Sequence, residues 1–237
     1  MNHVSAGGVR EPQQPFVQLG PEVLTAALET VPVGAVKEFT DSWNDLPADE
    51  HLPTDVPYRF RRYGTFRLVG ERWERLPHTA FFQGTNVNSV NGGVDRMFAP
   101  LDDSVATGPA LHAVVTALRE RLPGSGAGID TCGVHQIRVT ATAGAEGNPA
   151  PEGVHRDGHH YVGQVLIRRE DVQGAESCLY DLQHRPIHTT VLTEPFAAIV
   201  LDDRRVLHGV TPFAPSPGTR VGVRDTLLVD FFPRTAP

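Results

Sequence analysis

Residues 221–232, VGVRDTLLVDFF, predict a long strand and set the interpretation of the rest of the chain. Their β-branched and aromatic side chains favour extended backbone, and the loop APSPGTR before them is rich in turn residues. Similar runs, separated by Gly, Pro or Asp, occur at residues 58–69, 134–142, 161–168, 187–192 and 197–201. Strands at intervals of about ten residues are typical of a barrel or a sandwich.

Helical periodicity precedes most of these strands. Residues 21–46 contain two helical segments separated by Pro32 and Gly34. The clearest helix is PALHAVVTALRERL, residues 109–122, whose apolar residues recur at helical spacing and whose end is marked by Pro-Gly. Helices first and strands afterwards predict an α+β, mainly β domain in which antiparallel sheets are covered by the early helices.

Length and charge limit the domain count and the partners. The chain has 237 residues, a formal net charge of −7 and two cysteines. This length supports one core, so we expect a single domain over residues 15–237 after a flexible N-terminal arm, residues 1–14. The negative charge without a basic run argues against nucleic-acid binding. Without a membrane-spanning run or a secretory signal, we expect a cytoplasmic protein that has no membrane contact.

His155, Asp157 and His208 have the chemistry of a metal site. In extended backbone, side chains at i and i+2 share a face, so His155 and Asp157 can present a nitrogen and an oxygen to one ion. His208 follows an apolar strand in LDDRRVLHGVTP, while Gly153 and Gly158 indicate turns around the first two residues. Two histidines and one carboxylate leave coordination positions open, as in non-haem Fe(II) oxygenases.

Arg224 lies in the middle of an apolar strand, where an unpaired buried guanidinium is costly. The far carboxylate of a dicarboxylate cosubstrate would supply a bidentate partner. Thr226 shares the face of Arg224 and can donate its hydroxyl, and Arg220 on that face is the second choice. The alternatives are a salt bridge from Arg224 to Asp225 or Asp230, or exposure to solvent.

The combined motifs carry a resemblance to a known family. Its segments are HRDGHHYVGQVLIRREDVQGAES, LDDRRVLHGVTP and VGVRDTLLVDFF, with FFQGTNVNSVNGGVDRMFAP and VHQIRVTA upstream. They resemble the bacterial Fe(II)/2-oxoglutarate-dependent dioxygenase family of free L-amino acid hydroxylases, which includes L-isoleucine hydroxylases. The resemblance implies a double-stranded β-helix, a jelly-roll or cupin-like barrel with N-terminal helices packed on one sheet.

The resemblance also implies an activity and roles for individual residues. The activity is hydroxylation of an unactivated C–H of a free L-amino acid or closely related small molecule, with Fe(II), 2-oxoglutarate and O2, releasing succinate and CO2. By matching position, His155, Asp157 and His208 would bind iron as the catalytic centre, and Arg224 would bind 2-oxoglutarate. Further cofactor-binding candidates are Thr226, Arg220 and Gln136. Substrate-binding candidates are Arg96 and Arg62 for a carboxylate, Gln83 and Asn88 for neutral hydrogen bonds, and Asp225 for an ammonium if the strand bends.

Two other functions stay open for the same triad. A zinc-dependent hydrolase would need a general base, for which Glu152 is the nearest acid, and it would leave Arg224 without a role. A non-catalytic barrel would bind a metal or a small ligand without turning over 2-oxoglutarate. The sequence is also compatible with a homodimer.

Overall fold

The structure is a computed structural model that describes residues 14–52, 54–85, 92–124 and 126–234. The predicted arm, residues 1–14, lies outside the described residues except for Gln14, and so does Asn88. None of the helices in the described ranges combines the length and the apolar composition that a membrane-spanning helix needs.

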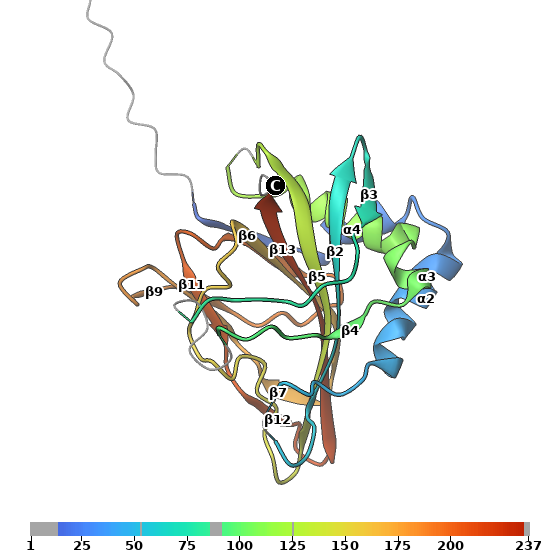
Figure 1. Ribbon diagram of the computed structural model, residues 1–237. Coiled ribbons are helices and arrows are strands. Elements are labelled where there is room, and N and C mark those ends of the chain that lie inside the picture. Colours follow the sequence, from blue (N-terminus) through green and yellow to red (C-terminus); the bar gives the residue numbers. More distant parts are fainter. Residues whose placement is uncertain (1–13, 53, 86–91, 125, 235–237) are drawn as a thin grey trace, which may run out of the picture.

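A large sheet of eight strands forms the centre of the fold (Figure 1). Its spatial order is β1 (Phe16–Leu19), β10 (Ala198–Asp202), β6 (Tyr161–Glu170), β13 (Val221–Pro233), β5 (Ile129–Thr142), β2 (Arg59–Val69) and β3 (Arg72–Arg75), and β4 (Ala99–Pro100) pairs with β2. All neighbours are antiparallel except β2 and β4. Among the described residues the sheet ends at β1 and β3, so it does not close into a barrel.

Shorter strands form a second layer. One small sheet has the order β11 (Leu207–Val210), β8 (Ser177–Tyr180), β9 (Pro186–Thr190), and another pairs β12 (Phe213–Pro215) with β7 (Val172–Gly174). In Figure 1 these strands lie on one side of the large sheet and the helices lie on the other. The predicted mainly β jelly-roll architecture, with helices packed on one sheet, is confirmed.

The helices cover one face of the large sheet and form the main core with it. They are α1 (Pro21–Leu28), α2 (Val33–Asp41), the 3-10 turn η1 (Ser42–Asp45), α3 (Asp103–Ala106) and α4 (Pro109–Arg119). From α4, Val114 and Leu118 are fully buried in one cluster with Val229 and Phe231 of β13. Helix α4 ends three residues before the predicted end, ahead of a turn in which Gly124 has φ +89°.

The long predicted strands are all present, and β5 begins five residues earlier than expected, at Ile129. The sequence missed the short strands β1, β3, β4, β7, β8 and β12, whereas β11 lies in the segment LDDRRVLHGVTP, where a strand reaching His208 was predicted. Strands of two to four residues are too short to show an alternating pattern, so their pairing depends on neighbours that are distant in the sequence.

The register of β2, β5 and β13 assigns their side chains to two faces. Residues directly opposite one another on paired strands share a face. One face, here called the pocket face, carries the rows Arg59–Val139–Arg224 and Arg61–Ile137–Thr226. The intervening rows, Phe60–Arg138–Asp225 and Arg62–Gln136–Leu227, lie on the helix face, which packs against the helices. The two faces therefore carry different parts of the chemistry.

Candidate active site

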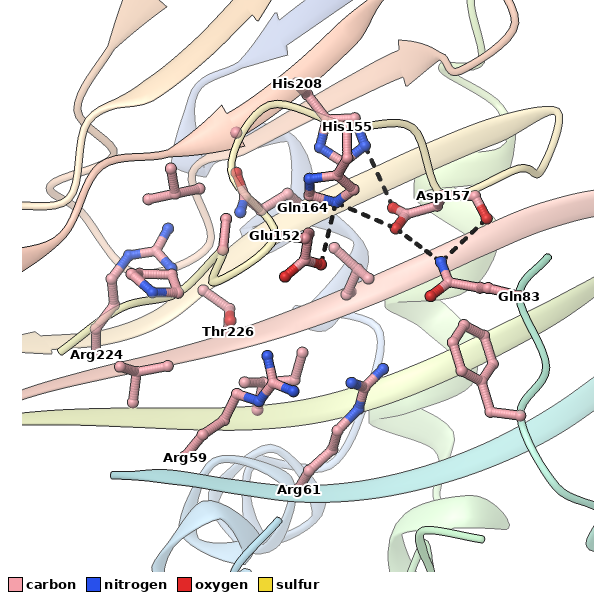
Figure 2. A pocket seen from close by; sticks show the side chains of 18 of the residues that line it. Arg59, Arg61, Gln83, Glu152, His155, Asp157, Gln164, His208, Arg224 and Thr226 are labelled. Carbon is pink, nitrogen blue, oxygen red and sulfur yellow. Dashed lines mark hydrogen bonds and ion pairs between the residues drawn. The ribbon is translucent and has the colours of Figure 1, made fainter. Parts of the chain in front are cut away.

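A pocket lies between the pocket face of the large sheet and strand β11 with the loop that contains residues 149–157 (Figure 2). Strands β2, β5 and β13 form its floor. Its charged and polar lining consists of Arg59, Arg61, Gln83, Arg96, Glu152, His155, Asp157, Gln164, His208, Arg224 and Thr226.

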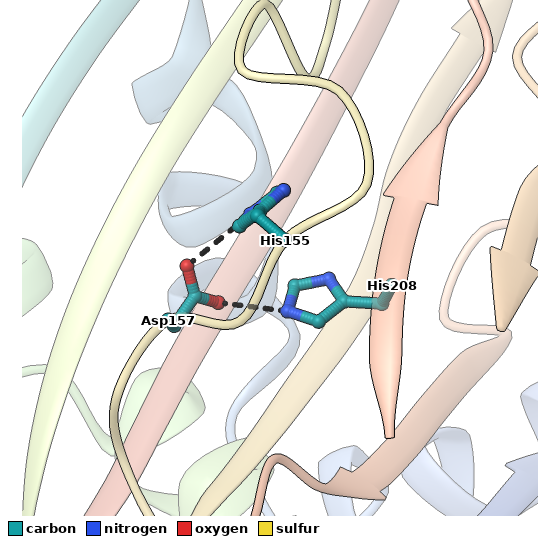
Figure 3. Close-up of side chains that lie close together, drawn as sticks. All are labelled: His155, Asp157 and His208. Atoms are coloured by element: carbon teal, nitrogen blue, oxygen red, sulfur yellow. Dashed lines mark ion pairs between the residues drawn. The ribbon is translucent and has the colours of Figure 1, made fainter. Parts of the chain in front are cut away.

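His155, Asp157 and His208 converge at one side of this pocket (Figure 3). His155 Nε2 is 3.5 Å from Asp157 Oδ1, and His208 Nε2 is 3.3 Å from Asp157 Oδ2. One ligand atom from each residue lies within 4.8 Å of the other two. Metal–nitrogen bonds of about 2.1 Å put neighbouring ligand atoms about 3 Å apart, so small side-chain adjustments let one ion bind all three.

The backbone around the triad holds its members together. His155 and His208 exchange two backbone hydrogen bonds, of 2.9 and 2.8 Å, although they are far apart in the sequence. Gly153 and Gly158 have φ of +76° and +84°, which glycine adopts without strain, so they provide the turns on either side of His155 and Asp157. The Asp203 carboxylate accepts hydrogen bonds from the backbone N–H of Asp157 at 3.0 Å and of Gly158 at 2.8 Å.

The hydrogen bonds leave metal-binding lone pairs available. His155 Nδ1 donates to the carbonyl oxygen of Gly153 at 2.8 Å, so the lone pair of the neutral ring would be on Nε2, the nitrogen that faces Asp157. Asp157 Oδ2 and His208 Nε2 are buried and face each other at 3.3 Å, but neither makes a hydrogen bond to the described residues. Buried polar atoms without partners are costly, and a divalent cation coordinated by these atoms would satisfy them.

The electrostatics of the triad also suit a cation. Burial lowers the pKa of His208, but the carboxylates of Asp157 and Asp203 outweigh it and raise that pKa to about 10. Burial raises the pKa of Asp157, but His208 and His155 together hold it well below the usual range of a carboxyl group. The cluster therefore favours positive charge, which a metal ion would supply in place of a proton.

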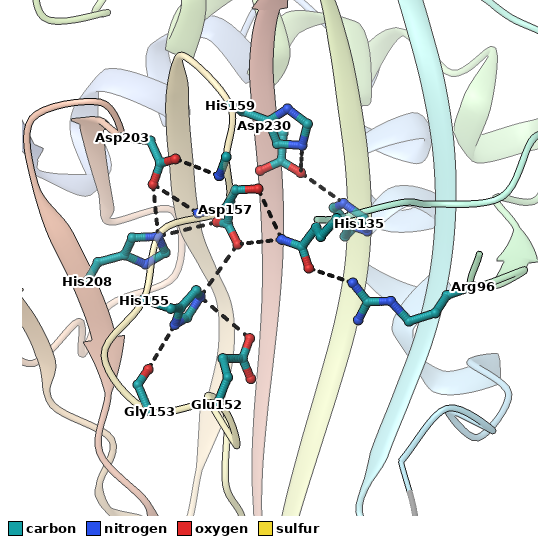
Figure 4. A network of polar contacts seen from close by, with 12 residues as sticks. Arg96, His135, Glu152, Gly153, His155, Asp157, His159, Asp203, His208 and Asp230 are labelled. Carbon is teal, nitrogen blue, oxygen red and sulfur yellow. Dashed lines mark hydrogen bonds and ion pairs between the residues drawn. The ribbon is translucent and has the colours of Figure 1, made fainter. Parts of the chain in front are cut away.

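Gln83 (labelled in Figure 2) and Arg96 (labelled in Figure 4), both predicted as substrate-binding residues, lie in a chain of hydrogen bonds that ends on Asp157. Gln83 Nε2 donates to the Asp157 carbonyl oxygen at 3.1 Å and to its Oδ1 at 3.4 Å. Arg96 Nη2 donates to Gln83 Oε1. This chain fixes the orientation of the Asp157 carboxylate as well as lining the pocket.

Arg224 is a buried cation on the pocket face. Only 2% of it is exposed, its Nε and Nη2 have no hydrogen-bond partner, and no carboxylate of the described residues lies within 4.0 Å. Burial and nearby Arg169 lower its pKa to about 10, so it is still charged at neutral pH. Thr226, one row along the same face, also lines the pocket. The salt bridges considered from sequence, to Asp225 or Asp230, are not formed.

Four other predicted residues do not reach the pocket. Arg62, Gln136 and Asp225 lie on the helix face, where they contact Asp102 at 3.1 Å, Ser42 Oγ at 2.6 Å and Arg138 at 2.7 Å respectively. Arg220 is exposed and precedes β13. Alternation along the strand separates these side chains from the pocket: Asp225 points opposite to Arg224, and the bulge beside it leaves it on the helix face.

Arg59, Arg61 and Gln164 also line the pocket, and the sequence did not single them out. The strand register could have identified the two arginines, because Arg59 lies in the same row as Arg224 and Arg61 lies in the same row as Thr226. Glu152, named only as the general base of a hydrolase, has Oε1 3.5 Å from His155 Nε2. The geometry thus meets that requirement of the hydrolase, but it gives Arg224 no hydrolytic role.

Comparison with known proteins connects this geometry to a family. A family model described as 2OG-Fe dioxygenase matches residues 40–230. The L-isoleucine-4-hydroxylase of Bacillus thuringiensis is 27% identical over 157 residues, which are 64% of this chain and 64% of that protein, less than two thirds of its length.

Two solved structures have the same fold. A BsmA homologue from Methylobium petroleophilum PM1 is 31% identical, with a TM-score of 0.78 over 94% of this chain and 91% of the other. The IDO protein of Bacillus thuringiensis is 20% identical, with a TM-score of 0.73 over 93% and 95% of the two chains. The second likeness, at this low identity, concerns the fold alone.

Proposed function

The chain belongs to the 2OG-Fe dioxygenase family, and from this premise we propose that it hydroxylates an unactivated C–H bond of a free L-amino acid or a closely related small molecule. It is a non-haem dioxygenase that uses Fe(II), 2-oxoglutarate and O2. The observation that carries the proposal is the presence in one pocket of an open metal triad and a buried guanidinium without a carboxylate partner.

We assign the iron ligands to His155, Asp157 and His208. When bound, iron and 2-oxoglutarate together activate O2, so that one oxygen atom enters the C–H bond and the other enters succinate as CO2 is released. His155 supplies Nε2, because its Nδ1 proton is held by Gly153. Asp157 supplies an oxygen atom. Its direction is set by the hydrogen bond from Gln83 and by the hydrogen bond from the Asp157 backbone N–H to the Asp203 carboxylate. These outer hydrogen bonds keep the triad in place.

We assign the remote carboxylate of 2-oxoglutarate to Arg224 and Thr226. The guanidinium can donate two parallel hydrogen bonds to a carboxylate, and the hydroxyl can donate a third. Binding would also neutralise a buried charge that the described protein groups leave unpaired. Enclosure of this region by β5 and β13 limits the access of water to the reacting groups.

The amino acid class is supported by the name of the 27% identical relative, an L-isoleucine-4-hydroxylase. The test has two stages. Anaerobic addition of Fe(II) and 2-oxoglutarate should produce a weak visible charge-transfer band, which should be absent in Asp157→Ala and retained in the exposed-loop control Glu146→Gln. The protein L-amino acids are then supplied with O2, and succinate and a product that has gained one oxygen atom are measured.

Each result has a definite meaning. A band followed by matched amounts of succinate and hydroxylated amino acid supports the proposal. No band in the wild type, together with zinc-dependent hydrolysis, would favour the hydrolase. A band without succinate release from any of these amino acids would contradict the proposed substrate class.

A further inference from the structure

Two buried guanidinium groups, those of Arg61 and Arg96, lie against the same pair of aromatic rings at the β2 side of the pocket. Arg61 Cζ is 4.1 Å from the ring centre of Phe98 and 5.5 Å from that of Phe81. Arg96 Cζ is 5.0 Å from the ring centre of Phe81 and 5.6 Å from that of Phe98. The rings hold both cations close together and fix the planes of their guanidinium groups.

No carboxylate of the described residues contacts this pair directly, although His135 connects Arg61 to the buried carboxylate of Asp230. No carboxylate in the described ranges lies within 4.0 Å of Arg61 or Arg96, whereas neighbouring Arg59 is paired with buried Asp49 at 2.8 Å. Arg61 bonds instead to His135 Nδ1 at 2.8 Å, Arg96 bonds to the amide oxygen of Gln83, and the buried Nε of each has no partner. Two adjacent, buried like charges are costly, so this end of the pocket favours an anion.

Glu152 places the opposite charge near the metal triad. Its Oε1 is 3.5 Å from His155 Nε2, the nitrogen that we assign to iron. Once a metal ion occupies that nitrogen, Glu152 loses this partner, and no arginine or lysine of the described residues lies within 4.0 Å. Its side chain is 16% exposed and lines the pocket, so it is accessible to a cationic group of a ligand.

We propose that the substrate binds as a zwitterion, with its carboxylate between Arg61 and Arg96 and its ammonium group on Glu152. The assignment rests on the proposed function for the position of the iron. It narrows the substrate to small molecules that carry both a free amine and a free carboxylate. Amides, esters and N-acylated amino acids lack one of these charges and are rejected.

Matched ligands test both anchors. The protein with Fe(II) and 2-oxoglutarate, kept anaerobic, is titrated calorimetrically with the protein L-amino acids, and the tightest binder is compared with its N-acetyl derivative and its carboxamide. Since losing one partner of a desolvated charge pair costs at least 2 kcal/mol, each derivative should bind about 30-fold more weakly or worse. A derivative that binds as tightly as the free amino acid would overturn the corresponding anchor.

Variants then attribute the effect to residues. Glu152→Gln should weaken binding of the free amino acid and leave the already weak binding of the N-acetyl derivative unchanged. Arg61→Gln should likewise weaken binding of the free amino acid and leave the already weak binding of the carboxamide unchanged. Exposed controls, Glu146→Gln and Arg72→Gln, should change neither affinity. Because removal of buried Arg61 can also affect folding, the ligand comparison in the wild type decides if that variant does not fold.

The outcomes separate this site from the proposed activity. A free amino acid that binds with the expected selectivity but releases no succinate contradicts the activity and leaves the zwitterion site standing. If no free amino acid binds while the charge-transfer band is present, the zwitterion site is wrong and the dioxygenase chemistry stands. Equal affinity of wild type and Glu152→Gln for the free amino acid also overturns the ammonium anchor.

Discussion

Arg224 and Asp225 are neighbours in β13, both fully buried, yet they have opposite surroundings because they lie on opposite faces of the sheet. On the helix face, Asp225 accepts two 2.7 Å hydrogen bonds from Arg138 and has Arg168 at 3.4 Å. On the pocket face, two nitrogens of Arg224 have no hydrogen-bond partner among the residues that the structure describes. The charge on the helix face is therefore paired within the fold, whereas the charge on the pocket face is accessible to the ligand that we propose.

The same contrast extends along the strand. On the helix face, Leu227, Val229 and Phe231 are fully buried in the apolar core. On the pocket face, Thr226 lines the pocket. Asp230, further along the same face, has Oδ2 3.1 Å from His135 Nε2. One strand thus contributes both to the stability of the domain and to its ligand site, and variants on the two faces should affect different measurements.

The largest effect on stability is expected for Asp225→Ala. Removing the carboxylate leaves Arg138 without its bidentate partner, which should cost about 3 kcal/mol and lower the Tm by about 6 to 12 °C. Thermal unfolding measures this effect. Titration of the folded variant with 2-oxoglutarate should give the wild-type Kd, and a large change in that Kd would contradict the separation of the two faces.

The next effect is expected for Arg224→Gln, one residue away. Loss of a charged hydrogen-bonding group should raise the Kd for 2-oxoglutarate about 10- to 100-fold, measured through the anaerobic charge-transfer band. The Tm should not fall, because an unpaired buried charge is removed. The exposed Arg220→Gln serves as the control and should keep the wild-type Kd. A loss of stability without a change in Kd would place Arg224 among the structural residues.

A smaller effect is expected for Gln83→Ala, because the Gln83 side chain connects Arg96 to Asp157. Without the hydrogen bonds from Gln83 to its carbonyl oxygen and its Oδ1, Asp157 is less well oriented, so the affinity for Fe(II) should fall about tenfold. Metal titration under anaerobic conditions measures this directly, and Gln173→Ala at an exposed position is the matched control. Unchanged iron affinity together with weaker substrate binding would limit Gln83 to lining the pocket.

Much of the fold and the centre of the site could be predicted from local patterns. The helix predicted at residues 109–122 from its apolar spacing and the long predicted strands are present in the structure. The spacing of His155 and Asp157, with glycines on both sides, predicted a pair of ligands that the structure brings to His208. The sequence singled out Arg224 because a charge inside an apolar strand requires a partner, and the structure places it buried in the lining of the pocket; its binding of 2-oxoglutarate stays a prediction.

The rest of the site depended on which face each strand presents. Gln136 and Arg62 were predicted to bind ligands, but alternation places them against the helices, and their neighbours His135 and Arg61 face the other way. Shifting a strand by one residue exchanges its two faces. Because both faces of β5 and β2 carry polar residues, their sequences alone do not show which set faces the pocket.

The sequence by itself determined the chemical groups, their spacing along each strand and the turns next to them, because these depend on covalent geometry and local backbone preference. The tertiary structure alone decided that Arg61 of β2 packs against Phe81 and Phe98 next to Arg96. Such contacts join residues that are distant in the chain. They follow from strand register and sheet packing, which the whole domain sets together rather than any single segment.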